Sequence, residues 1–500
     1  MKQLFPRSFY NLTSLIGATI AGVCLTLIIF LFILEAFEGH SKPYMGIITL
    51  VILPLFMTGG LVLVAHGILR EHRLVRKGKR SSLVLPVIDL HNPRHRMAFM
   101  ATGLGFLFFL GFSAFGSFKV YEFTDSDQFC GEMCHSVMHP EYTAYQFSPH
   151  ARVGCAQCHI GSGAQWFVKA KISGSYQVYS VLFNKYSKPI PTPIDNLRPA
   201  QETCEQCHWP KHFFSEKQKV NTYYLSDKQN TKWTLNLLIK IGGGNNEEGP
   251  TSGIHWHMNI ANEITYMPWD ETRQTIPWVK VKHADGIERV YQSTEIKVSK
   301  NVIDETPKRR MDCIDCHNRP THIYHHPAAS VNQAMSVGWI SDSLPFIKNL
   351  TVKTLQMPYT SSEAAYDSIG SLITDFYKNQ FPALLQSVHK KEKIDKAISE
   401  VRKIYSRNFF PTMNVSWKKF PDNIGHMYSL GCFRCHDGKH VSNDGKVLSR
   451  DCNTCHTILA QKFEKGALRI ALDGIEYRHP TDIGDEWKVK SCSECHNEEL

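Results

Sequence analysis

Three long apolar stretches fill the N-terminal part of the chain. They run from Leu12 to Phe37, from Met45 to Leu69 and from Met97 to Phe118, and each is long enough to supply the ~20 residues that a membrane-spanning helix needs. The first stretch is longer than the apolar core of a cleavable signal, and no small-residue cleavage site follows it. The pattern therefore predicts a retained three-helix membrane anchor within residues 1–118.

Positive charge is divided unequally between the two loops that join these stretches. The loop from Glu71 to Arg96 carries seven Lys and Arg residues, whereas the loop from Glu38 to Pro43 carries only Lys42. Cytoplasmic loops of membrane proteins are enriched in Lys and Arg, so we expect the basic loop and the N-terminus to be cytoplasmic. Three crossings of a bacterial inner membrane then place everything after Phe118 in the periplasm.

The hydrophobic pattern changes twice beyond the membrane stretches. Between residues 221 and 310, short β-branched and aromatic segments alternate with turn residues, which predicts a small β-rich insertion. Between residues 327 and 425, apolar side chains recur three or four positions apart, for example over 391–407, which predicts helices.

Cysteine usage identifies the class of protein. Fourteen of the fifteen cysteines form seven pairs that are each followed directly by His, and only Cys24 is left over. Cys-x-x-Cys-His attaches haem c, because two thiols bind the haem vinyl groups and the His binds the iron. Zinc sites also use cysteine pairs, but seven pairs that each carry His argue against zinc. The groups are Cys130, Cys134 and His135; Cys155, Cys158 and His159; Cys204, Cys207 and His208; Cys313, Cys316 and His317; Cys432, Cys435 and His436; Cys452, Cys455 and His456; and Cys492, Cys495 and His496.

The sequence therefore predicts a membrane-anchored multihaem cytochrome c with seven covalently attached haem c groups. Three N-terminal transmembrane helices precede a haem-packed periplasmic region, mostly α-helical or irregular, with a small β insertion. We expect six regions: the anchor (1–118), haems 1–3 (119–220), the β-rich insertion (221–310), haem 4 (311–326), a helical segment (327–425) and haems 5–7 (426–500).

The formal net charge of +10 does not indicate a nucleic-acid partner. Each haem brings two propionates, so seven haems would add about fourteen negative charges and cancel the excess. We therefore expect no nucleic acid among the partners.

Further histidines can supply the second axial ligand of each iron. Thirteen histidines beyond the membrane stretches lie outside the motifs, enough for bis-histidine ligation of at least six irons. We expect the distal ligands among His150, His212, His255, His257, His322, His426, His440 and His479, and leave His283, His325, His326 and His389 as non-ligands. The first motif has three residues between its cysteines, and Met138 is a candidate ligand of its iron, with a packed methionine as the alternative.

The chain resembles the NapC/NirT family of membrane-bound quinol dehydrogenases in its membrane anchor, its irregular first motif and the Met near that motif. Segments such as Cys134-His-Ser-Val-Met-His-Pro-Glu-Tyr142 and Asn196-Leu-Arg-Pro-Ala-Gln-Glu-Thr-Cys204 carry the resemblance, which covers residues 97–326. The whole chain is similar to larger inner-membrane members from metal-reducing bacteria. The resemblance implies that menaquinol reduces the first haem, which relays electrons to periplasmic c-type cytochromes in anaerobic or extracellular respiration.

The resemblance also implies where quinol binds. The family's quinol-site lysine lies on the helix after the second motif, where Lys169 and Lys171 stand. The aromatic, lysine-bearing segment 166–183 suits a helix at a membrane surface, and packing on haem faces is compatible with that placement. No acidic residue follows the lysines as in the family, so Glu132 or Glu141 is the candidate acceptor of the quinol protons, unless both are ordinary surface acids.

Besides a quinol dehydrogenase, two other functions fit seven haem motifs. The first is a reductase of nitrite or hydroxylamine with an open iron, and the second is an electron-transfer subunit of a larger quinone-reactive complex. The supply of distal histidines favours the quinol dehydrogenase over the reductase, because a reductase needs a vacant iron position.

Overall fold

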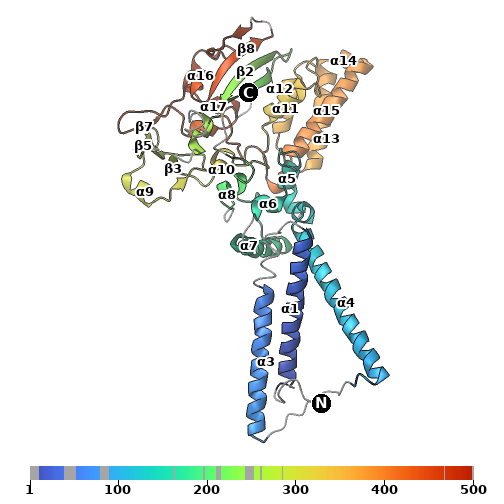
Figure 1. Cartoon of the computed structure of the whole chain (residues 1–500). Coiled ribbons are helices and arrows are strands. Elements are labelled where there is room, and N and C mark those ends of the chain that lie inside the picture. Colours follow the sequence, from blue (N-terminus) through green and yellow to red (C-terminus); the bar gives the residue numbers. More distant parts are fainter. Residues whose placement is uncertain are drawn as a thin grey trace. The chain divides into compact units, whose positions relative to one another are not determined.

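The computed structural model describes residues 9, 11–38, 52–78, 89–133, 135–161, 164–194, 198–209, 215–242, 253–258, 262–283, 285–464, 466 and 468–497. The chain forms two compact units (Figure 1). The anchor unit comprises residues 1–133 and 154–178, and the main unit comprises residues 134–153 and 179–500.

Three long apolar helices form most of the anchor unit, as the sequence predicts. They are α1 (Leu12–Glu38), α3 (Leu53–Arg76) and α4 (Pro93–Thr124), and each is long and apolar enough to cross a membrane. The predicted second stretch begins at Met45, outside the described residues, and α4 continues six residues beyond the predicted end at Phe118. The protein is therefore a membrane protein.

Small residues allow α1 and α3 to pack closely. A Cβ atom added to Gly17 would lie 2.5 Å from the carbonyl oxygen of Gly60, and one added to Gly60 would lie 2.7 Å from that of Gly17. One turn away, the Ser14 hydroxyl donates to the Val64 carbonyl oxygen at 3.2 Å. Close backbone approach at glycines and hydroxyl bonds between helices are what hold helices together in lipid.

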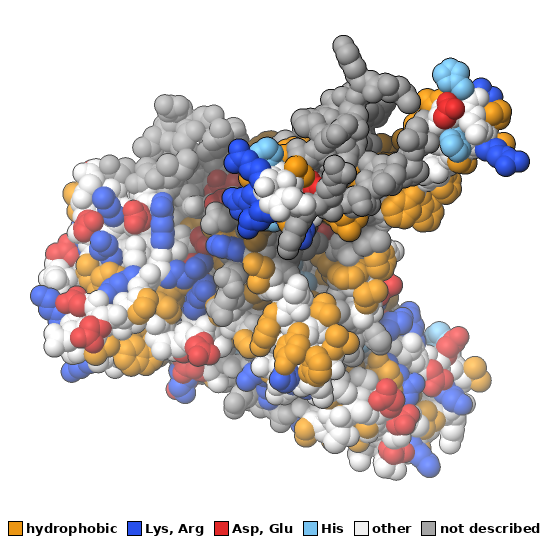
Figure 2. Space-filling model, turned by 90° about the horizontal axis from the view of Figure 1, so that it is seen from below, with side chains coloured by type: hydrophobic (Ala, Val, Ile, Leu, Met, Phe, Trp, Pro, Cys, Tyr) orange, Lys and Arg blue, Asp and Glu red, His pale blue; other side chains and the backbone are white. Residues whose placement is uncertain are grey.

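The rest of the anchor unit carries Cys130 of the first motif and the whole second motif. After α4 come the π-helix η3 (Phe129–Met133), the short helix α6 (Cys155–His159) and most of α7 (Ala164–Leu182). Figure 2 shows groups of hydrophobic side chains exposed on the face that it draws. Exposed large apolar residues are frequent on α3, α4 and α7, as expected where lipid replaces water.

Two antiparallel sheets form the β part of the main unit. One has the order β1 (Glu216–Tyr224), β2 (Lys232–Lys240), β8 (His456–Phe463), β9 (Arg469–Ile470). The other has the order β6 (Arg309–Arg310), β3 (Glu263–Met267), β4 (Trp278–Lys282), β5 (Glu288–Ser293), β7 (His440–Ser442).

The expected β insertion is not closed on itself. Strands β7, β8 and β9 come from the last haem region and complete both sheets. Strand β8 pairs with the edge of β2 and β7 with the edge of β5, which would otherwise present unpaired backbone groups, and β9 pairs with β8. Sequence patterns did not predict this pairing, because β7 and β9 have only three and two residues.

The expected helical segment is present as α11 (Pro327–Ser336), α12 (Ile347–Gln356), α13 (Ser362–Gln380), α14 (Pro382–Gln386) and α15 (Val388–Asn408). The apolar face expected over 391–407 is buried, and the Ser361 hydroxyl accepts a bond from the Ala364 N–H at 3.1 Å as the cap of α13. The core of these helices includes Val137 and Ala144 of α5 (His135–Gln146). The segment therefore packs on the helix that begins with the first motif histidine.

The remaining elements are short and lie near the motifs. They are α8 (Ala200–Cys204), η5 (Ile254–Met258), α9 (Lys300–Glu305), α10 (Cys313–Cys316), η6 (Pro411–Met413), η7 (Gly431–Arg434), η8 (Cys452–Thr454), α16 (Glu486–Val489) and α17 (Cys492–His496).

Lys348 of α12 is a lysine buried in the helical core. The residue is 4% exposed, and its Nζ donates to the Ala328 carbonyl oxygen at 2.7 Å. Burial lowers the pKa of Lys348 to about 7. The unfolded chain therefore binds more protons than the folded chain above that pH, and the free energy of unfolding rises with pH toward the ordinary lysine pKa.

We predict that Lys348→Met stabilises the folded protein at neutral pH. The gain should be on the order of 3 kcal/mol, since the desolvation cost outweighs the lost hydrogen bond. It should shrink as the pH rises to about 10, where the unfolded lysine also loses its proton. Thermal unfolding of the detergent-solubilised protein at several pH values measures this. Lys353→Met on the same helix is the control, and an equal effect of both variants would contradict the assignment.

Candidate functional site

Short helical turns bring the two cysteines of most candidate motifs to one side of the backbone. The second, fourth and seventh motifs form α6, α10 and α17, and the fifth and sixth form η7 and η8. Residues three positions apart are neighbours on a helix, so both thiols of a motif can reach one haem edge. None of the described cysteines is in a disulfide bond.

Acidic residues inside two motifs shape these turns. Asp312 and Asp315 form a reciprocal capping box on α10, and Ser491 and Glu494 form one on α17. In each case the acid is the residue just before the second cysteine. The cap satisfies backbone N–H groups that such short helices leave open, and so it stabilises the turn that carries the two cysteines.

The first motif differs because it has one extra residue. The structure accommodates it as the π-helix η3 (Phe129–Met133), the usual result of inserting a residue into a helix. Cys134 and the side chain of His135 lie outside the described residues. Met138 lies one turn into α5 and is half-buried, so its role as an iron ligand stays a prediction.

Five motif histidines face a second histidine at one characteristic separation. The ring centres are 6.1 Å apart for His150 and His208, 6.5 Å for His255 and His317, 5.8 Å for His257 and His436, 6.2 Å for His426 and His456, and 6.1 Å for His479 and His496. Two metal–nitrogen bonds of about 2 Å, plus the distance from each nitrogen to its ring centre, put two imidazoles about 6 Å apart across one metal ion. The five separations therefore fit one iron between each pair.

Hydrogen bonds hold several of these rings by one nitrogen. The Nδ1 atoms of His255, His257, His436 and His479 lie 2.8–3.2 Å from backbone carbonyl oxygens. A histidine that binds a metal ordinarily donates its other ring N–H in this way. The bond fixes the ring and leaves Nε2 for the iron.

Burial keeps the paired rings neutral, the form in which imidazole binds a metal. Burial lowers the pKa of His257, His436, His456 and His496, and lowers that of His426 to about 4. Within the described part of the chain, the buried Nδ1 atoms of His150, His426 and His456 have no hydrogen-bond partner. Buried polar atoms of native proteins are normally satisfied, so these rings fit a site completed by a prosthetic group.

Three predicted distal ligands are not in these pairs. Both ring nitrogens of His440 are bonded, to Asp437 Oδ1 at 2.9 Å and to the Ile276 carbonyl oxygen at 2.7 Å, so the structure does not support it as a ligand. Burial alone would lower the pKa of His440, but its bond to Asp437 raises it above the ordinary value. His322 has Nδ1 2.9 Å from the Glu141 carbonyl oxygen, as a ligand would, and His212 lies outside the described residues.

Cysteines of successive motifs lie next to one another, which gives the order of the sites. In the anchor unit, Cys130 and Cys155 share a hydrogen bond. In the main unit, Cys204 bonds Cys313, and electrostatic contacts join Cys316 to Cys435, Cys432 to Cys455 and Cys452 to Cys492. The first cysteine of the first motif is thus next to the second motif in one unit, and the last five motifs form a series in the other.

The four residues proposed for quinol chemistry have different surroundings. Lys169 of α7 is exposed, with Nζ 4.6 Å from the centre of the Trp166 ring, and the side chain of Lys171 lies outside the described part. Glu132 is exposed on η3. Glu141 is largely buried, near Tyr324 Oη at 3.2 Å and Arg319 Nη2 at 3.5 Å. Burial raises the pKa of Glu141, partly opposed by Arg319.

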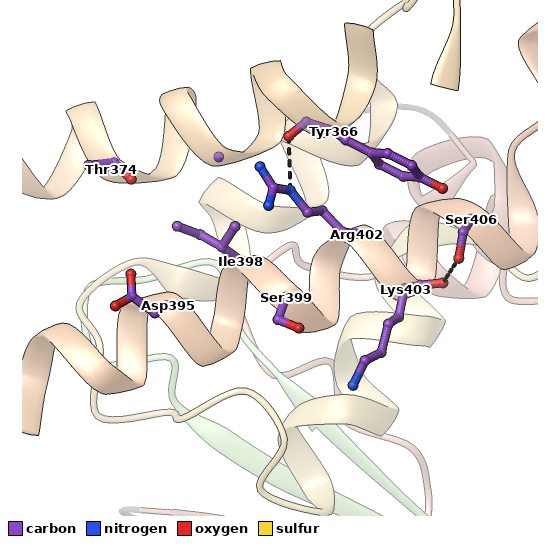
Figure 3. A pocket seen from close by; sticks show the side chains of 9 residues that line it. Tyr366, Thr374, Asp395, Ile398, Ser399, Arg402, Lys403 and Ser406 are labelled. Atoms are coloured by element: carbon purple, nitrogen blue, oxygen red, sulfur yellow. Dashed lines mark hydrogen bonds between the residues drawn. The ribbon is translucent and has the colours of Figure 1, made fainter. Parts of the chain in front are cut away.

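A groove of about 630 Å³ between α13 and α15 contains none of the candidate residues. Figure 3 shows Arg402 pointing across it to Tyr366, where its Nε donates to the backbone oxygen at 2.9 Å. A Cβ atom on Gly370 would lie 2.6 Å from Arg402 Nη2, so the glycine makes room for the guanidinium. We interpret the groove as a polar seam between two helices.

Several contacts that shape the sites could not be read from the sequence. Asp127 Oδ1 accepts a bond from the Cys155 N–H at 2.7 Å and ties the first two motifs together. Arg319 and Tyr324 hold Glu141, and Arg434 bonds backbone oxygens 119 and 161 residues away. These residues follow no periodic pattern, and their nearness to a cysteine pair was the only available signal.

Membrane-spanning helices followed by helical Cys-Cys-His turns and paired histidines define a membrane-anchored multihaem cytochrome c. Residues 93–191 match the N-terminal region of the NapC/NirT cytochrome c family. The chain is 44% identical over 493 residues to the cytochrome c-type protein ImcH of Geobacter sulfurreducens. The aligned region covers 97% of this chain and 95% of that protein. The chain therefore belongs to the NapC/NirT cytochrome c family, as the sequence motifs indicated, and has covalently bound haem c. No solved structure matches it significantly.

We predict that His479→Ala converts one haem from low spin to high spin. His479 is the partner of His496, and its loss leaves one axial position of the seventh iron open to water. Electron paramagnetic resonance of the oxidised protein measures the change as a new high-spin signal. His389→Ala is the control, because that side chain is 77% exposed. An unchanged low-spin count in His479→Ala would refute the pairing.

Proposed function

We propose that this protein oxidises menaquinol in the bacterial inner membrane and passes the electrons through seven haem c groups to periplasmic c-type cytochromes. The observation that carries the proposal is the placement of Cys130, the whole second motif and most of α7 in the same compact unit as the three membrane helices. A haem c bound at each motif would supply one-electron chemistry. With the N-terminus and the basic loop in the cytoplasm, all motifs lie on the periplasmic side.

Helix α7 has the surface expected of a quinol-binding element. Ile172, Tyr176 and Leu182 are exposed apolar side chains on this helix, which can face the lipid from which quinol arrives. Lys169 is held over Trp166 by a cation–π contact, so its ammonium group stays close to the apolar surface. An ammonium group there can bond a quinol oxygen and stabilise the anion formed as the quinol loses its proton.

Quinol oxidation releases two electrons and two protons, so a proton acceptor is needed beside the lysine. Glu132 suits this role because it is exposed, belongs to the same unit as Lys169 and lies within the first motif. Glu141 suits it less, since its carboxylate is held by Tyr324 and Arg319. We assign Glu132 to the quinol protons and Glu141 to the support of His322, which its backbone oxygen contacts.

The order of adjacent motifs supports a linear path that ends at the seventh site. A cysteine of each motif in the main unit lies near a cysteine of the next motif along the sequence, from Cys204 to Cys492. Residues 470–500, around the last motif, carry eight acidic and three basic side chains. An acidic exit favours encounter with a cytochrome that has a basic surface.

The paired histidines favour electron transfer over substrate reduction. A reductase of nitrite or hydroxylamine needs an iron with an open position, whereas five sites have two histidines at the separation expected for two axial ligands. Those five sites are therefore closed to substrate in this proposal.

We expect replacement of Lys169 or Lys171 by Leu to slow quinol-driven reduction at least tenfold, since an electrostatic contact to a developing anion is worth about 3 kcal/mol. Dithionite should still reduce all haems, because it bypasses the quinol site. Stopped-flow spectroscopy with a menaquinol analogue measures both rates.

Lys185→Leu is the matched control for this experiment. Lys185 follows α7, and its Nζ bonds Tyr179 Oη at 2.8 Å, so it is a lysine of the same region with an intramolecular partner. Normal quinol-driven rates in both single variants and in the double variant would eliminate the proposed quinol site. The lysines would then serve only to bind lipid phosphates.

A further inference from the structure

A buried ionic cluster joins the fourth and fifth motifs, and its centre is Asp315, the residue just before Cys316. The Asp315 side chain is 1% exposed. Its Oδ1 accepts bonds from Tyr266 Oη at 2.6 Å, Arg309 Nε at 2.8 Å and Arg273 Nη1 at 3.1 Å. Its Oδ2 accepts the Asp312 N–H at 2.8 Å. Four hydrogen bonds, two of them from guanidinium groups, therefore hold this carboxylate in place.

The corresponding residue of the fifth motif, Arg434, completes the cluster. Arg434 precedes Cys435, is buried, and donates from Nη2 to the Asp315 carbonyl oxygen at 2.6 Å. Its Nη1 donates to the Arg273 carbonyl oxygen and its Nε to that of Gly431, both at 2.9 Å. The two residues enclosed by neighbouring cysteine pairs are thus directly bonded.

The distal histidines of the same two sites are joined as well. His255 and His257 both lie on η5 and face His317 and His436. Trp256 between them packs against the core of the five-stranded sheet, which also contains Tyr266. The fourth and fifth sites are therefore both connected to the five-stranded sheet. Arg309 and Arg273 bond Asp315 of the fourth motif, and η5, which packs on the sheet through Trp256, carries the distal histidines of both sites.

Burying these charged side chains costs desolvation free energy, which apolar side chains of similar size would not cost. Buried ion clusters are often no more stabilising than well-packed apolar residues, whereas a fixed charge in a dry site strongly affects any redox group beside it. Asp315 and Arg434 each neighbour a cysteine that holds a haem in the proposed function. Their charges are opposite, so their effects on the two haems should be opposite.

We propose that Asp315 and Arg434 are positioning residues that fix the fourth and fifth haems as one rigid pair and separate their reduction potentials. The carboxylate favours the oxidised, more positive iron of the fourth haem, and the guanidinium favours the reduced iron of the fifth. The sheet inserted between the third and fourth motifs then serves as the holder of this pair. The inference rests on haem attachment at both motifs, not on quinol oxidation.

The test is potentiometric titration of the purified holoprotein with chemical mediators, which needs no quinol. Asp315→Asn should raise the potential of one haem, and Arg434→Gln should lower that of another. Each shift should be at least tenfold in the reduction equilibrium, 59 mV for a one-electron couple. Arg434→Lys should keep the potential near that of the unmodified protein, because the charge remains.

Control variants separate this role from a general structural one. Arg289 Nε and Asp444 Oδ2 form an ion pair of 3.1 Å at the same sheet, and the Asp444 side chain is exposed. Arg289→Gln and Asp444→Asn remove this pair and should leave every reduction potential unchanged. If Asp315→Asn fails to retain its haems, Arg273→Gln tests the cluster instead, because the Arg273 side chain is 19% exposed. This variant should lower the reduction potential of one haem. Shifts of the same sign in Asp315→Asn and Arg434→Gln, or no shifts, would overturn the inference.

Haem content, measured on every variant, distinguishes failure of the inference from failure of the function on which it rests. Fewer than seven haems in the unmodified protein would refute the haem assignment itself. Seven haems with unshifted potentials in the variants would refute only the role of the cluster.

Discussion

A haem iron with two histidine ligands needs two imidazole rings about 6 Å apart, and five histidine pairs beyond the membrane helices meet this requirement. One ring of each pair adjoins its cysteines and is fixed by the local turn. The other comes from a distant part of the chain, as with His255 and His317 or His426 and His456. The fold must therefore bring separate segments together to within a fraction of an ångström.

The sheets and the helical segment meet this demand in different ways. The five-stranded sheet packs against Trp256 and so positions the two histidines of η5. The four-stranded sheet begins its strand β8 with His456 itself, so that strand pairing orients a motif histidine. The helical segment packs its core on α5, next to the first motif. Each region outside the motifs thus has an identifiable task in holding a ligand or a motif.

The sequence was sufficient for the features that depend on local pattern. The membrane helices, the cysteine motifs, the family and the apolar face of α15 follow from spacing and hydropathy. It was insufficient where partners are remote: nothing local distinguishes His440, whose nitrogens bond Asp437 and Ile276, from His426, which faces His456. The same is true of Asp315 and Arg434, because a buried hydrogen bond from a guanidinium to the backbone of another motif depends on tertiary packing.

The number and ligation of the irons test this account most directly. Quantitative electron paramagnetic resonance of the fully oxidised protein, with haem content determined on the same sample, counts low-spin and high-spin irons separately. The account predicts seven haems per chain, at least six of them low-spin with two histidine ligands. Two or more high-spin haems, or fewer than seven haems in total, would contradict it.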